Sequence, residues 1–194
     1  MSLELKVDKK LTQFSTEIHK DIIEASKIGD QKAQYKLYQL YAKAMFNICY
    51  RMMNNFEEAE DILQEAFTEV FTKLHTFRYE STFGAWFKRI VINKCINEIK
   101  RKKADLVLYD EFHTFEQEAE EETDVNENKL NVNRVQKAIE QLPDGYRIIF
   151  SLYMLEGYDH SEISEILDIS ESTSKSQYMR AKRKLKEILN YQLS

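Results

Sequence analysis

The carboxyl-terminal part of the chain carries a run of side chains suited to contacting DNA. Residues 172–186 contain six basic side chains and no acid. If this segment is helical, one face holds Ser172, Thr173, Ser176, Met179, Arg180 and Arg183, and Lys175 and Gln177 flank it. Hydroxyl, amide and guanidinium groups can hydrogen-bond base edges in a major groove, and cations farther along a helix can contact phosphates. The pattern predicts a DNA-reading helix, and an ordinary solvated helix face is the alternative.

A second group of side chains, between residues 77 and 103, combines aromatic rings, amides and cations. Its aromatic members are Phe77, Tyr79, Phe83, Trp86 and Phe87, and its polar members are Arg89, Asn93, Lys94, Asn97, Lys100, Arg101, Lys102 and Lys103. Unpaired bases stack on rings, while cations and amides contact phosphates and base edges. The composition favours a single strand as the ligand, although Phe83 and Trp86 also fit an ordinary core. If Asn93 is buried it needs a polar partner, and an extruded base is one candidate.

Helices must position both groups, because every patterned segment outside one acidic stretch has a helical period. The periodicity predicts helices over 17–28, 32–53 and 57–74, and a fourth from an N-cap at Ser81 to about residue 103. The fourth helix is apolar on two opposite faces, which predicts a central helix buried on both sides. Farther on, helices are expected over 132–142 and 146–155, and Asp159 and Glu162 form the capping box of a short third helix. After a tight turn at 168–170, Ser170 or Ser172 caps a last helix to about residue 189, which completes a helix-turn-helix.

Acidic side chains are concentrated between the two groups. Residues 104–128 hold ten acids and no lysine or arginine, although the whole chain of 194 residues has a net charge of only −5. Such a stretch cannot bury enough apolar surface to fold, and it is long for a loop within a compact domain. We therefore expect an all-α protein of two small domains, 1–103 and 129–194, joined by an acidic flexible linker over 104–128. An acidic loop inside a single domain is the alternative.

The composition disfavours several classes of protein. Four glycines and one proline are too few for a turn-rich β fold, and no long uncharged apolar run predicts insertion into a membrane. Cys49 and Cys95 fall in helical patterns without C-x-x-C spacing, as expected of buried, reduced thiols in a cytoplasmic protein. We find none of the common nucleotide-binding, hydrolase or metal-binding motifs. We therefore expect no enzymatic activity, no catalytic residue, no metal and no cofactor.

Two blocks of the sequence resemble one protein family. The segments AEDILQEAF at 59–67 and FRYESTFGAWFKRIVIN at 77–93 resemble region 2 of bacterial sigma-70 factors. The segments EISEIL at 162–167 and STSKSQYMRA at 172–181 resemble their region 4. The chain is similar to the small extracytoplasmic-function (ECF) type, which consists of little besides these two domains. The resemblance implies a sigma factor, which gives RNA polymerase its promoter specificity when transcription is initiated.

The resemblance also implies a role for each block. Region 2 of the family binds the β′ subunit of core polymerase through positions that match Asp61, Gln64 and Glu65. It opens and reads the −10 element through a segment that here includes Phe77, Arg78, Ser81, Trp86, Arg89, Asn93, Asn97 and Arg101. Region 4 docks on the β subunit and reads the −35 element through a helix that here includes Ser172, Thr173, Lys175, Ser176, Gln177, Arg180 and Arg183. Core polymerase and promoter DNA are thus the expected partners, the family also allows for an anti-sigma factor, and we expect a monomer when the protein is free.

Three positions depart from the usual pattern of the family. Asp168 and Tyr79 stand where glycine is common, and Gln177 stands where arginine is usual. Asp168 must close its turn without a glycine of positive φ, or must itself tolerate that conformation. Tyr79 would alter the pocket for an extruded base, and Gln177 would favour an adenine edge over a guanine edge.

A helix-turn-helix repressor is the main alternative, with an amino-terminal domain that binds a ligand or dimerises. Such a repressor binds a duplex operator by itself, whereas a sigma factor requires core polymerase. Without the resemblance, Asp61, Gln64 and Glu65 would be interpreted as an ordinary solvated helix face.

Overall fold

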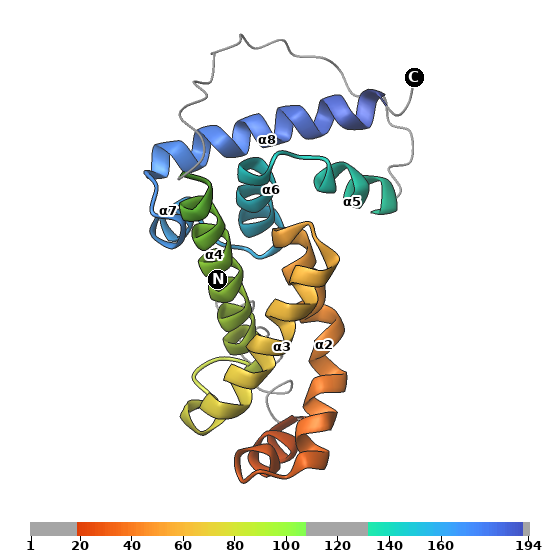
Figure 1. Ribbon diagram of the computed structural model, residues 1–194, viewed down its shortest axis with the longest axis vertical. Helices are drawn as coiled ribbons and strands as arrows, with labels where there is room; N and C mark the ends of the chain where they lie inside the picture. The colour runs from red at the N-terminus through yellow and green to blue at the C-terminus, as the bar shows by residue number, and fades with distance from the viewer. Residues whose placement is uncertain (1–18, 108–131, 192–194) are drawn as a thin grey trace, which may run out of the picture. The chain divides into compact units, whose positions relative to one another are not determined.

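The computed structural model describes residues 19–107 and 132–191, with side chains over 19–102 and 132–190. Within these ranges every regular element is a helix, which confirms the predicted all-α fold (Figure 1). A helix over 19–27 is followed by α2 (Gln31–Met53), α3 (Phe56–Lys73), the short 3-10 helix η1 (Leu74–Thr76) and α4 (Phe83–Val107). The second range holds α5 (Val132–Glu140), α6 (Asp144–Phe150), the π-helical segment η2 (Ser151–Leu155), α7 (His160–Leu167) and α8 (Glu171–Tyr191). None of the helices in these two ranges is long and apolar enough to cross a membrane.

The chain divides into two compact units, Met1–Asn97 and Glu98–Ser194, and the division falls inside α4. Helix α4 continues to Val107, so the first four residues of the predicted acidic linker are helical. The rest of that linker, 108–128, lies outside the described residues. The limits expected for the two domains and the linker, 1–103, 104–128 and 129–194, remain predictions.

In the first unit, short capped turns separate successive helices. The carboxylate of Asp30 accepts hydrogen bonds from two N–H groups in the first turn of α2. Asn54 ends α2 in the left-handed conformation (φ 54°), and Asn55 caps α3 by accepting from the N–H of Glu58 at 3.1 Å. Asparagine tolerates the left-handed region and is a favoured N-cap. The turn at 54–55 therefore reverses the chain, and α2 and α3 pack side by side (Figure 1).

Helix α4 is the central helix of this unit. Its buried residues are Phe83 and Phe87 from one predicted apolar face, Ile92, Cys95 and Ile96 from the other, and Val91 between the two. The ring centroid of Phe87 lies 4.7 Å from that of Phe67 in α3 and 6.3 Å from that of Tyr41 in α2. The predicted burial of this helix on two sides is therefore confirmed.

The start of α4 differs from the prediction by one residue. Thr82, rather than Ser81, precedes the first helical residue, and its Oγ1 accepts a hydrogen bond from the N–H of Ala85 at 3.2 Å. A side-chain oxygen in this place satisfies one of the N–H groups that a helix start leaves without a partner. Ser81 belongs instead to the loop over 77–82, where it is exposed.

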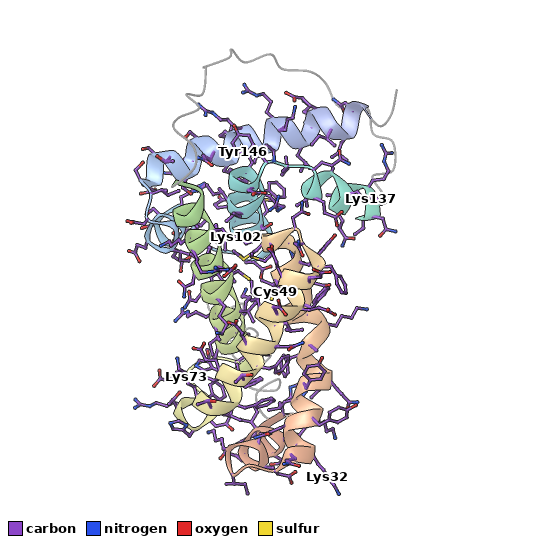
Figure 2. All side chains as sticks on the ribbon, viewed as in Figure 1. Lys32, Cys49, Lys73, Lys102, Lys137 and Tyr146 are labelled. Carbon is purple, nitrogen blue, oxygen red and sulfur yellow. The ribbon has the colours of Figure 1, made fainter. Side chains whose placement is uncertain are left out.

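Both cysteines are core residues of the first unit. Cys49 of α2, labelled in Figure 2, and Cys95 of α4 are free thiols and fully buried. The neighbouring Cys49 thiol, together with burial, raises the pKa of Cys95. The prediction of buried thiols is confirmed.

The second unit is built against one side of α8. Its buried cluster consists of Ile139, Leu142, Phe150 and Ala181, with Val135, Tyr146, Tyr178, Leu185 and Ile188 packed on it. The side of α8 opposite the predicted DNA-reading face, formed by Tyr178, Ala181, Leu185 and Ile188, belongs to this cluster. The opposite face of α8 is the one that can meet a ligand.

Helices α7 and α8 form the predicted helix-turn-helix. Asp159 accepts from the N–H of Glu162 at 2.8 Å, and the Glu162 carboxylate accepts from the N–H of Asp159 at 2.9 Å, which confirms the capping box. Asp168 ends α7 in the left-handed conformation (φ 56°), so aspartate replaces glycine in this turn. Ser170 then caps α8 by accepting from the N–H of Thr173 at 3.0 Å.

Candidate nucleic-acid interface

One face of α8 is exposed along about three turns of the helix. Ser172, Ser176, Met179 and Arg183 recur at intervals of four, three and four residues, and all four are exposed. Met179 is 59% exposed although its side chain is apolar. This stripe, the α8 face, points away from the core side of the helix, as the sequence predicts. In a major groove, its hydroxyl groups and its guanidinium can hydrogen-bond base edges. Its one apolar side chain, Met179, can contact a thymine methyl group.

The residues that flank the α8 face are less accessible. Its half-buried neighbours are Thr173, Gln177 and Arg180. Lys175 is exposed and forms an ion pair with Glu171 at 2.6 Å. The Oε1 of Gln177 lies against Gly145 at the start of α6, where an added β-carbon would come within 3.1 Å of it. Gln177, one of the seven residues predicted to contact the −35 element, thus has its side-chain oxygen beside another helix of its own unit.

A partly buried hydrogen bond joins α7 to α8. The Nδ1 of His160 lies 2.9 Å from the Oγ of Ser174, which is fully buried. The His160 ring stacks on Tyr153 with centroids 4.4 Å apart, and Tyr153 packs on Tyr178 at 4.5 Å. Burial, and then the neighbouring Tyr153, raise the pKa of Tyr178, so its hydroxyl stays protonated and donates to the sulfur of Met154 at 2.9 Å. This network fixes the rotation of α8 and thus the direction of the α8 face. Sequence reasoning missed it because a histidine and a serine fourteen positions apart both fit a solvated helix surface.

In the first unit, the aromatic residues of 77–87 form one cluster. Phe77, Phe83 and Phe87 are buried, whereas Tyr79 and Trp86 are half-buried. The ring centroid of Phe77 lies 4.7 Å from that of Tyr79 and 5.3 Å from that of Trp86. Phe77 was expected to contact DNA, but its side chain is only 4% exposed. Within this cluster, therefore, the rings that solvent or a base can reach are those of Tyr79 and Trp86.

Exposed polar side chains follow one face of α4. Arg89, Asn93 and Asn97 recur every four residues and are all exposed. Because Asn93 is exposed, it needs no buried partner, and the argument from burial for an extruded base beside it fails. Arg101 is exposed and forms a bidentate contact with Glu98, at 2.6 and 2.9 Å. This face offers amides and one arginine to a strand, and Arg101 already has a carboxylate neighbour.

Acids of α3 neutralise another cation of α4. The Nζ of Lys94 lies 3.2 Å from a carboxylate oxygen of Glu65 and 3.2 Å from one of Glu69, which also pairs with Lys73 at 2.6 Å. Burial lowers the pKa of Lys94, but its hydrogen bonds to Glu69 and Glu65 outweigh this effect and raise the pKa. The hydrogen bond from Lys73, followed by that from Lys94, lowers the pKa of Glu69 against the effect of burial. Lys94 therefore links α3 and α4 through ion pairs.

The residues assigned to polymerase by resemblance form a compact group on α3. Asp61, Gln64 and Glu65 are exposed, and Asp61 shares one helix face with Gln64 and Glu65, which follow it by three and four residues. Glu65 is the member that pairs with Lys94. Within 19–107 and 132–191, no group of His, Cys, Asp or Glu side chains is arranged to hold a metal ion.

Comparison with known proteins gives matches in both units. Residues 37–104 match the family described as sigma-70 region 2, and residues 132–185 match sigma-70, region 4. The ECF RNA polymerase sigma factor SigW of Bacillus subtilis is 32% identical over 176 residues, which cover 86% of this chain and 94% of SigW. The ECF RNA polymerase sigma factor SigM of Mycobacterium tuberculosis is 27% identical over 173 residues, which cover 88% of this chain and 84% of SigM.

A solved structure shows the same fold. The sigma factor RpoE of Bartonella quintana, in complex with the anti-sigma factor NepR, superposes with a TM-score of 0.52 and 20% sequence identity. The superposition covers 80% of this chain and 96% of RpoE. The likeness supports the helical architecture of both units.

Proposed function

The chain belongs to the sigma-70 family and is an ECF sigma factor that directs promoter-specific initiation of transcription, and from this we propose which of its surfaces contact the promoter and which contact polymerase. It acts as the specificity subunit of RNA polymerase and has no catalytic activity of its own. One unit reads the −35 element, and the other opens and reads the −10 element. Core polymerase, bound through both its β and β′ subunits, holds the two contacts on one promoter.

The second unit reads the −35 element through α8. The proposed contacts are Ser172, Thr173, Lys175, Ser176, Gln177, Arg180 and Arg183, and Met179 is added to them as an apolar contact to a thymine methyl group. The observation that carries the proposal is the α8 face, which is exposed, polar and cationic and lies opposite the core side of a helix-turn-helix. The second helix of such a motif places its exposed front in a major groove.

Helix α4, including its part beyond the first unit, and the loop before it read and open the −10 element. The residues proposed for this task are Phe77, Arg78, Ser81, Trp86, Arg89, Asn93, Asn97 and Arg101, of which all but the buried Phe77 contact the DNA directly. The exposure of Arg89, Asn93 and Asn97 along one face of α4 supports a strand that follows this helix. Trp86 offers a half-buried ring for base stacking, and Phe77 acts indirectly by supporting that ring.

The polymerase contact of the first unit is proposed for Asp61, Gln64 and Glu65 of α3. Their exposure on a single helix face is what a rigid docking surface requires. Glu65 also pairs with Lys94 of α4, so this docking surface is tied to the helix that carries most of the proposed −10 contacts.

The remaining parts of the proposal concern organisation and partners. The acidic stretch between the units acts as a flexible linker that lets them reach two separated promoter elements. An anti-sigma factor is a proposed regulator, because the similar RpoE fold is known in complex with one. We further propose a cytoplasmic protein that is monomeric until it meets polymerase.

Run-off transcription with bacterial core RNA polymerase tests the proposal on a pool of promoter fragments. We expect start sites that depend on this protein and that share sequence upstream at two places. Arg183→Gln should weaken initiation and Arg89→Gln should impair opening, whereas the matched controls Lys137→Gln and Lys36→Gln, both at exposed lysines, should behave like the wild type. No initiation, together with tight duplex binding in the absence of polymerase, would make the protein a repressor instead.

A further inference from the structure

Tyr79 has an unusual backbone conformation for its residue type. It lies in the loop over 77–82, between η1 and α4, and its φ is +61°. Within the described ranges the other non-glycine residues with positive φ are Asn54 and Asp168, which end helices and belong to types that tolerate this region. Tyr79 ends no helix, so contacts from elsewhere in the fold must hold it in this costly conformation.

Those contacts come from the helix over 19–27. The hydroxyl of Tyr79 donates to Oε1 of Glu24 at 2.5 Å. The Nζ of Lys27 donates to the same carboxylate oxygen at 2.9 Å and to the carbonyl of Phe77 at 3.0 Å, and it lies 4.7 Å from the centroid of the Tyr79 ring. Because Glu24 and Lys27 are one helical turn apart, a single face of this helix holds both the backbone and a side chain of the loop.

The charges of this group support one another. Hydrogen bonds from Tyr79 and then from Lys27 lower the pKa of Glu24, against a small effect of burial. Burial and the hydrogen bond to Glu24 raise the pKa of Tyr79. Near neutral pH the Glu24 carboxylate is therefore ionised and the Tyr79 hydroxyl is protonated. The hydrogen bond from Tyr79 to Glu24 requires these two states.

The rest of the loop is left open to a ligand. Arg78, Glu80 and Ser81 are exposed, and Arg78 and Ser81 are among the residues proposed above to contact the −10 element. A loop whose backbone is already fixed loses less conformational freedom when it binds, and it presents its side chains in one geometry. The contacts to Tyr79 thus bear on how the exposed side chains meet a base.

We propose that Glu24, Lys27 and Tyr79 form a latch through which the helix over 19–27 sets the base selectivity of the −10 contact. This inference rests on the proposed function. The helix precedes residues 37–104, which match sigma-70 region 2, so the latch adds an element that this match does not include. Tyr79 is a positioning residue in this scheme, because Glu24 holds its hydroxyl and Lys27 and Phe77 pack against its half-buried ring, while the exposed side chains of the loop meet the DNA.

The test is transcription in vitro by core polymerase and the full chain on two promoter pools. One pool is randomised across the −10 element and the other across the −35 element. Tyr79→Phe removes only the hydroxyl of the latch, and Glu24→Ala removes its acceptor. Glu24→Gln keeps an acceptor oxygen and is the conservative rescue, while Tyr35→Phe, at an exposed tyrosine of α2, is the matched control.

We expect Tyr79→Phe and Glu24→Ala each to reduce the preference for the favoured base at one or more −10 positions by about fivefold, which corresponds to the loss of one hydrogen bond. Glu24→Gln and Tyr35→Phe should stay within about twofold of the wild type. Preferences in the −35 pool should not change, and because preferences are ratios, a smaller amount of folded protein does not alter them.

Two results would overturn the inference, and they can be told apart. If Tyr79→Phe and Glu24→Ala keep the wild-type −10 preferences while the wild type initiates normally, the latch does not set selectivity and the proposed function stands. If the wild-type chain starts no transcription from any fragment, the proposed function fails and the inference fails with it.

Discussion

The hydrogen bond between His160 and Ser174 provides a direct test of how α8 is held. His160→Phe should keep the ring stacked on Tyr153 but leave the buried hydroxyl of Ser174 without its partner. A buried polar group without a partner costs about 1–3 kcal/mol. We therefore expect His160→Phe to lower the free energy of unfolding of the second unit by about that amount.

Ser174→Ala removes the same hydrogen bond from the other side. His160 is half-buried, so water can replace the lost partner, and the expected loss is about 0.5–1.5 kcal/mol. In the double variant neither group is left without a partner. The loss for the double variant should therefore be smaller than the sum of the single losses by about 1 kcal/mol.

Urea unfolding of the full chain, followed by far-UV circular dichroism, measures these losses. Trp86 is the only tryptophan of the chain and belongs to the first unit, so its fluorescence identifies the transition of that unit and separates the two. Ser176→Ala, on the exposed face of the same helix, is the matched control and should change the free energy by less than about 0.5 kcal/mol. If the losses of the two single variants add within about 0.3 kcal/mol, the hydrogen bond does not couple α7 to α8 and the reasoning is refuted.

Three other residues give separate expectations. In −35 fragments, replacing thymine by uracil at the position that Met179 contacts should weaken binding of the polymerase complex by about fourfold. Met179→Ala should remove this difference. If fluorescence anisotropy shows the same loss of affinity for the wild type and for Met179→Ala, the contact is excluded. Asp168→Gly should raise the melting temperature of the second unit, because glycine adopts a φ of 56° without the cost that aspartate bears, and a lower melting temperature would contradict this. Lys73 and Lys94 lower the pKa of Glu69 in the folded state, so Glu69 stabilises the fold at any pH above its ordinary pKa of 4.5. That contribution is lost as the pH falls through the lower pKa of the folded state. Glu69→Gln should therefore flatten the fall in stability below pH 4.5, and an unchanged slope in unfolding experiments between pH 6 and 3 would be the contrary result.

Local rules explain which parts of the fold could be predicted. The capping box at Asp159 and Glu162 depends on residues three positions apart, and the core side of α8 follows from a period of 3.6 residues. The two-sided burial of α4 could be predicted for the same reason. The start of α4 could not, because Ser81 and Thr82 are adjacent and either can cap a helix; only the direction of the chain decides between them.

The parts of the candidate sites that could not be predicted depend on contacts between distant residues. Tyr79 and Glu24 are 55 positions apart, and Lys94 and Glu65 are 29 positions apart. Sequence patterns place each of these side chains on a helix or in a loop, but they do not indicate which partner it meets. The same limit applies to Gln177, whose type predicted contact with a base but whose Oε1 lies against Gly145. The contact proposed for Gln177 at the −35 element therefore requires that DNA draw its side chain away from α6.

Ion pairs within each unit bear on why promoter recognition depends on polymerase. Lys94 is paired with acids of α3, Arg101 with Glu98 and Lys175 with Glu171. When such a cation contacts a phosphate, the carboxylate beside it repels the same phosphate, so the net attraction of the surface is smaller than a count of cations implies. Each unit alone should thus hold DNA weakly. Once polymerase carries both units, binding of the second unit to the promoter becomes intramolecular. An effective concentration in about the millimolar range then compensates for the weak electrostatic attraction of each unit to DNA. Discrimination should then depend on the groups proposed to meet base edges, such as Ser176 and Asn93, more than on charge.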